Sequence, residues 1–93
     1  MKYLIVNDSD GGDFLLSSIR SDIAEAIREC RDINRELRDI DNAARDGFPA
    51  YTDGYFSVYS YRGNAALTVG QPAPRTARLH KRATRKAQPY YSE

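Results

Sequence analysis

The residue types best suited to nucleophilic catalysis occur once each in this chain, as Cys30 and His80. A catalytic Cys-His pair needs contact between the two side chains and a third group that orients the imidazole. Cys30 falls on the apolar face of a predicted helix, where cysteine behaves as a small hydrophobic residue. His80 falls in a basic segment near the end of the sequence, and no orienting group is evident. We therefore predict that the protein is not an enzyme and needs no cofactor.

The acidic turn from Asp8 to Asp13 has the residue types of a calcium loop. An EF-hand loop needs oxygen ligands at its first, third and fifth positions, glycine at the sixth and glutamate at the twelfth. Counted from Asp8, the last three of these positions hold Gly12, Asp13 and Ile19. The spacing therefore favours a plain polar turn, and we expect no bound metal.

Tyrosines alternate along a predicted strand at residues 55–61, where Phe56 and Val58 take the opposite face. Tyrosine is a good strand former in its own right. An exposed row of tyrosines also suits a protein contact, because each ring offers a large area at little cost in rotamer entropy. We predict that the row binds a partner through Tyr55, Tyr59 and Tyr61.

The end of the chain is strongly basic. Residues 1–69 contain eight Lys/Arg against twelve Asp/Glu, a balance of −4, whereas residues 70–93 contain six against one, a balance of +5. Three hypotheses remain open for this tail: it contacts nucleic-acid phosphates, it is a solvated extension, or it lies across the acidic body. The predicted partner-binding cations are Arg75, Arg78, Lys81, Arg82, Arg85 and Lys86.

One long amphipathic helix is predicted at residues 22–46. Asp22 and Glu25 have the spacing of a capping box at its start, and Gly47 followed by Pro49 marks its end. Its apolar residues recur in steps of three and four, which places them on one face. They are Ile23, Ala26, Ile27, Cys30, Ile33, Leu37, Ile40 and Ala44.

Four short segments have the composition of β-strands: residues 3–6, 14–19, 55–61 and 65–69. With the helix they predict an α+β fold of order ββαββ. In this fold the helix packs on a four-stranded antiparallel sheet and leaves the other sheet face open.

The prolines at 72 and 74 break regular structure and predict a domain boundary. We expect a compact ββαββ domain at residues 1–70 that folds by itself. Residues 71–93 then form a Pro-bounded basic tail, in which a short helix over residues 76–87 is compatible with the sequence.

The composition predicts a cytoplasmic protein without a membrane segment. A single cysteine excludes an internal disulfide, which fits a reducing compartment. The apolar run at residues 3–6 is too short for a signal peptide or a membrane span.

A small domain with this plan and no catalytic motif is expected to act by binding. In size and general plan it resembles small phage or mobile-element inhibitors of host machinery, of which anti-CRISPR proteins are an example. The resemblance implies a host protein or complex as partner, in a bacterial cytoplasm, with the chain a monomer or homodimer. It assigns no site residues. The alternative is a small nucleic-acid-binding or regulatory protein that uses the basic tail.

Overall fold

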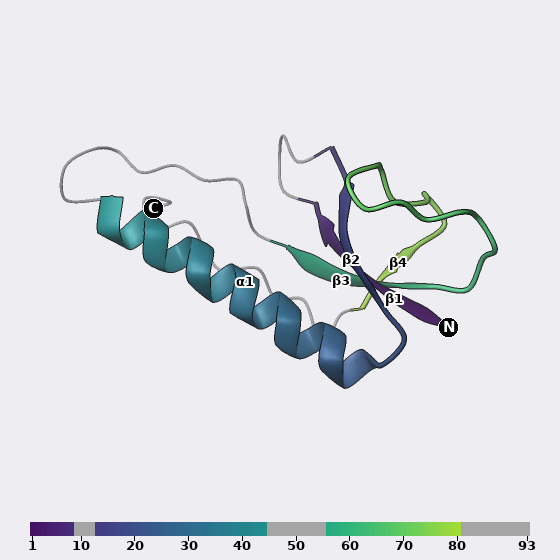
Figure 1. Cartoon of the computed structure of the whole chain (residues 1–93), viewed down its shortest axis with the longest axis horizontal. Helices are drawn as coiled ribbons and strands as arrows, with labels where there is room; N and C mark the ends of the chain where they lie inside the picture. Colours follow the sequence, from purple (N-terminus) through teal and green to yellow (C-terminus); the bar gives the residue numbers. More distant parts are fainter. Residues whose placement is uncertain (9–12, 45–55, 81–93) are drawn as a thin grey trace.

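The computed structural model describes residues 1–8, 13–44 and 56–80. Along the chain these form β1 (Lys2–Asn7), β2 (Leu15–Arg20), α1 (Ile23–Ala44), β3 (Ser57–Tyr61) and β4 (Arg78–Leu79). The strands make one antiparallel sheet in the order β2-β1-β3-β4. α1 lies along one face of this sheet (Figure 1), so the predicted α+β class is confirmed.

α1 begins at the predicted place, but its N-terminal cap differs from the predicted capping box. The Asp22 carboxylate accepts a long hydrogen bond of 3.4 Å from the Ala24 amide, and the Asp22 carbonyl accepts from the Ala26 amide at 3.1 Å. Glu25, instead of reaching back to the cap, approaches Arg20 at 4.0 Å. The predicted end at Gly47 lies outside the described residues.

The helix packs on the sheet through the first half of its apolar face. Ala26 and Cys30 are buried against Ile5 of β1 and Val58 of β3, with Ile27, Ile33, Tyr3 and Phe56 packed around them. We call this the helix-side cluster. Strands of five or six residues are only about 17–20 Å long, whereas a 22-residue helix is about 33 Å long, so the sheet can cover only part of the helix.

The second face of the sheet is covered, which corrects the prediction of an open face. Residues 62–77, here called the crossing segment, leave β3, reach the outer edge of β2 and return to form β4 (Figure 1). Their small side chains pack under the sheet and close a second core. This crossing-side cluster consists of Leu4, Val6, Leu16, Tyr61, Ala73 and Ala77.

The predicted fourth strand at residues 65–69 does not form. Only Leu67 of this stretch packs against the crossing-side cluster, and the stretch ends in a turn where the Gln71 amide donates to the Thr68 carbonyl at 3.1 Å. Gly70 sits in this turn at φ 93°, a conformation that glycine adopts without a Cβ clash. Arg78 and Leu79 take the edge position beside β3 instead, pairing with Ser60 and Tyr59.

The prolines do not end the packed structure, although the sequence predicts a boundary after residue 70. Pro72 bridges to Leu15, and the Ala73 amide donates to the Phe14 carbonyl at 2.9 Å. Proline is tolerated at such a sheet edge, because no ladder bond from its nitrogen is needed. Ala73 and Ala77 are only 5% and 9% exposed, so the chain after residue 70 packs on the sheet through these two alanines.

Candidate functional site

The predicted tyrosine surface does not exist as an open face in the described residues. Tyr61 is 5% exposed, and its hydroxyl accepts a hydrogen bond from the Ala65 amide at 3.0 Å. A Cβ added at Gly63 would overlap the Tyr61 ring, so the crossing segment lies directly on it. Tyr59 is half-buried and packs edge-on against Phe14, with ring centroids 5.1 Å apart. Tyr55 lies outside the described residues.

Asp8 ties two β3 side chains to the end of β1. Its carboxylate accepts from the Ser57 hydroxyl at 3.0 Å and from the Tyr59 hydroxyl at 2.8 Å. Burial raises the pKa of Tyr59 well above its usual value, and the hydrogen bond and negative charge of Asp8 raise it further. Ser57 is only 1% exposed, so this group of polar residues holds the strand and offers no nucleophile to a substrate.

Cys30 is held as a neutral thiol. Burial, with the charges of Asp8 and Glu29, raises the pKa of the thiol to about 11, while a hydrogen bond from Asn34 opposes the change. The thiol donates to the Phe56 carbonyl at 3.2 Å. His80 makes other contacts: its ring lies edge-on to Tyr3, with ring centroids 6.5 Å apart, and its amide donates to the Val58 carbonyl at 2.9 Å. A thiol that keeps its proton at neutral pH is a poor nucleophile.

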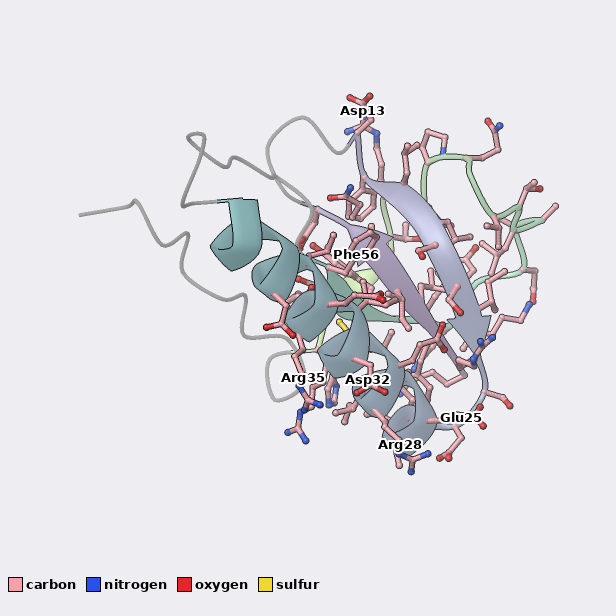
Figure 2. All side chains as sticks on the ribbon, turned by 60° about the vertical axis from the view of Figure 1, so that its left-hand side comes forward. Asp13, Glu25, Arg28, Asp32, Arg35 and Phe56 are labelled. Atoms are coloured by element: carbon pink, nitrogen blue, oxygen red, sulfur yellow. The ribbon has the colours of Figure 1, made fainter. Side chains whose placement is uncertain are left out.

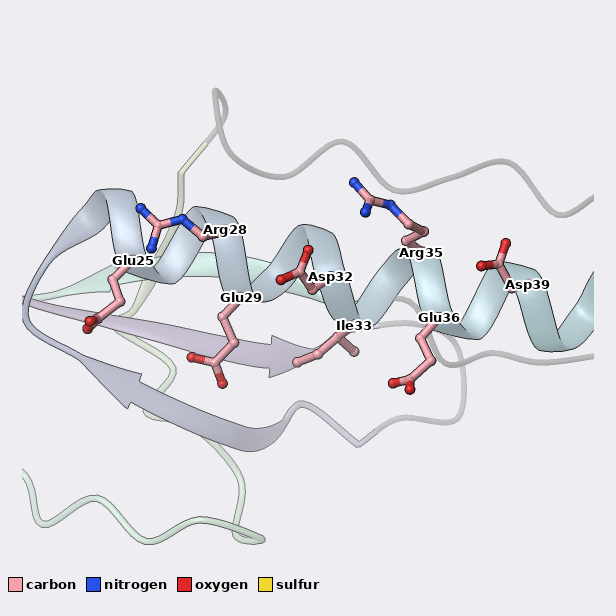
Figure 3. Close-up of a pocket in the computed structure, with 8 residues that line it drawn as sticks. All are labelled: Glu25, Arg28, Glu29, Asp32, Ile33, Arg35, Glu36 and Asp39. Carbon is pink, nitrogen blue, oxygen red and sulfur yellow. The ribbon is translucent and has the colours of Figure 1, made fainter.

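The outer face of α1 is highly charged, with both signs present. Arg28, Asp32 and Arg35 point away from the sheet (Figure 2). They belong to a shallow hollow in which Glu25, Glu29 and Glu36 point toward the β2 side and Arg28 and Arg35 to the other (Figure 3). On the β2 side, the Arg20 Nε contacts the Glu29 carboxylate at 2.8 Å. These mixed charges make a solvated surface rather than a single-sign field.

The opposite charge distribution is found at the β3–β4 edge. No Asp or Glu occurs between residues 54 and 92, while seven Lys/Arg do. Arg62 and Arg78 line one hollow together with Met1, Ser60 and Thr76. Arg75 lines another hollow with Asp13, Phe14, Pro72 and Ala73. All three of these arginines are exposed.

The structure therefore describes only part of the predicted basic site. Arg75 and Arg78 are exposed on the folded domain, whereas Lys81, Arg82, Arg85 and Lys86 lie outside the described residues. Arg62 was not among the predicted site residues, because the predicted basic region began at residue 70. The signal that could have found it is the absence of acidic residues from position 54 to position 92.

Comparison with known proteins places the chain in no group: no family model, curated protein or solved structure matches it. Among the described residues, no helix is long and apolar enough to span a membrane. Within the same residues, no group of three or more His, Cys, Asp or Glu side chains has an arrangement that could hold a metal ion.

Proposed function

We propose that this chain is a non-enzymatic nucleic-acid-binding protein, and that it contacts phosphates through its basic β3–β4 edge and the basic segment that follows. The observation that carries the proposal is the charge distribution: seven cationic residues and no acidic ones between residues 54 and 92, with Arg62 and Arg78 exposed at the β3–β4 edge. Arg75 is also exposed, but it lies in a separate hollow that contains Asp13. A surface of one sign concentrates an oppositely charged polymer near it and gains from counterion release.

The inhibitor hypothesis from the sequence gains no contact surface from the described tyrosines. That hypothesis came from the size and plan of the chain, and the tyrosine row was the surface predicted for the protein contact. Tyr61 is a core residue and the Tyr59 hydroxyl donates to Asp8, so these two tyrosines offer little to a partner. Inhibition of host machinery by a phage protein stays a prediction, as do the cytoplasmic location and the absence of catalysis.

The test is a salt titration of oligonucleotide binding. For the full chain, we expect log Kobs to fall linearly with log salt, with a slope of about 0.7–0.9 for each phosphate neutralised. Charge reversal in the basic segment, Arg82→Glu with Arg85→Glu, should abolish binding or flatten the slope, because it removes several phosphate contacts at once.

The matched control places the same two reversals on the helix, at Arg28 and Arg35, which are exposed on the far face. This control should bind as the wild type does. A dissociation constant of about 10⁻⁴ M or weaker at physiological salt, typical of non-specific contact, would contradict the proposal. So would equal losses in both double variants.

A further inference from the structure

The hollow at the β3–β4 edge combines two guanidinium groups with two hydroxyls. Ser60 of β3 pairs with Arg78 of β4, so their side chains leave the sheet on the same face. Arg62, two residues after Ser60, and Thr76, two residues before Arg78, line the same hollow. Two adjacent chain segments therefore bring four hydrogen-bond donors to one concave place.

The guanidinium groups of this hollow are available to a ligand. Arg62 and Arg78 are exposed. Among the described residues, the ion pairs are those of Arg20 with Glu25 and Glu29, so neither arginine of the hollow is neutralised there. The Ser60 hydroxyl donates to the Arg78 carbonyl at 3.4 Å, a long and exposed bond that a closer acceptor can replace.

The hollow differs in kind from the hollow on α1. That one is lined by five carboxylates and two arginines (Figure 3), which repel an anion and compete for the guanidinium donors. The β3–β4 hollow has no carboxylate in its lining. Arginine presents paired N–H donors in a rigid planar fork that matches the oxygens of a phosphate group.

We propose that this hollow is a phosphate-binding site, in which Arg62 and Arg78 hold the anionic oxygens while Thr76 and Ser60 donate from their hydroxyls. The inference rests on the proposed nucleic-acid function, which it deepens by giving one phosphate a fixed position on the folded domain. The cationic residues between positions 81 and 86 attract the nucleic acid without fixing its position. The hollow fixes the register of the nucleic-acid strand by holding one phosphate.

The test uses inorganic phosphate as the probe and amide chemical shifts of the full chain as the readout. Phosphate replaces chloride at constant ionic strength. We expect saturable shifts that centre on Ser60, Arg62 and Arg78. Arg62→Ala and Arg78→Ala should each weaken binding by about tenfold, the loss expected for one charge-assisted contact. Arg75→Ala, an exposed arginine outside the hollow, is the matched control and should leave the affinity unchanged.

The results of the two experiments distinguish failure of the phosphate site from failure of the proposed nucleic-acid binding. Oligonucleotide binding without saturable phosphate shifts would overturn the site and leave the function standing. Phosphate shifts in a chain that binds no oligonucleotide would keep the site, and the phosphate would then come from a smaller ligand. Equal weakening in all three single variants would overturn the site, because it would show diffuse attraction without a fixed position.

Discussion

At the scale of single residues, the side chain of Asn34 joins the helix to the sheet. Its amide nitrogen donates to the Phe56 carbonyl at 2.9 Å, and its oxygen accepts from the Phe56 amide at 2.7 Å. The side chain thus pairs with the backbone just before β3, as a neighbouring strand would. Phe56 packs against the helix-side cluster between α1 and the sheet (Figure 2). Helical periodicity cannot predict this role, because Asn34 is polar and lies beside the apolar stripe.

Replacing Asn34 with alanine should therefore destabilise the fold. Asn34→Ala leaves the partly buried Phe56 amide without a partner and leaves the Phe56 carbonyl only the weak Cys30 thiol donor. We expect a cost of about 1–3 kcal/mol, even though alanine is the better helix former. The neighbouring Arg35→Ala is the control; Arg35 is exposed, and its loss should cost under about 0.5 kcal/mol. Chemical denaturation measures both free energies of unfolding, and equal losses would contradict the assigned role of Asn34.

The raised pKa of the Cys30 thiol predicts how the free energy of unfolding depends on alkaline pH. Burial raises the pKa of its thiol in the folded state from 9.0 to about 11. Between these values the unfolded chain loses the thiol proton while the folded chain keeps it, so the free energy of unfolding falls as pH rises. The fall amounts to about 1.4 kcal/mol per pH unit at most, and on the order of 2 kcal/mol over the window.

The measurement for Cys30 is urea unfolding of the wild type and Cys30→Ala at several pH values from 7 to 11. Both chains retain Tyr59, whose raised pKa contributes in the same direction, so only the difference between their pH dependences reports on the thiol. We expect a steeper decline in the wild type above pH 9. Parallel curves would show that the thiol does not titrate differently in the two states.

At the scale of elements, the sequence pattern was enough for α1, which carries an apolar stripe, and for β1, β2 and β3, which are short apolar or aromatic runs. It could not predict the irregularity in β2. Ile5 pairs with Ser18 but Val6 pairs with Leu16, so Ser17 is an extra residue in a β-bulge. The bulge lets Leu16 and Ile19 face the same crossing-side cluster, although they are three positions apart in the sequence. In a regular strand they would face opposite sides.

The crossing segment could not be predicted for a different reason. It has no repeating pattern, and its buried residues are the alanines Ala73 and Ala77, which carry little hydrophobic signal. They are buried because their small side chains let the backbone approach the sheet closely, which only the folded structure decides. For the same reason the fourth strand forms at Arg78–Leu79 instead of residues 65–69, and Tyr61 packs in the crossing-side cluster with Tyr59 against it. Of the candidate site, the basic composition was predictable, whereas the hollow that joins Arg62 to Arg78 was not.

At the scale of the whole molecule, the acidic residues and the acid-free stretch lie on different sides of the sheet. The helix and its acidic residues cover one face, while the crossing segment and β4, which carry no acidic residue, complete the other face and the β3 edge. The core therefore depends on the same stretch of chain that carries the described part of the basic surface. Any truncation that removes the basic residues from position 71 onward also removes core.

Two truncations test this dependence. A chain ending at residue 70 lacks Ala73, Ala77 and β4, and exposes the sheet face around Leu4, Val6 and Leu16. Exposing such side chains costs roughly 1.5–3 kcal/mol each when complete, which is comparable in sum to the roughly 5–15 kcal/mol that stabilises a typical domain. We therefore expect residues 1–70 to lose the cooperative thermal transition, contrary to the boundary predicted from the sequence.

The longer truncation, residues 1–80, should keep this transition in circular dichroism and should keep the phosphate-induced shifts at Arg62 and Arg78. Its affinity for oligonucleotides should fall, because residues 81–86 are lost. A cooperative transition of unchanged midpoint in residues 1–70 would show that the residues after position 70 add no stability.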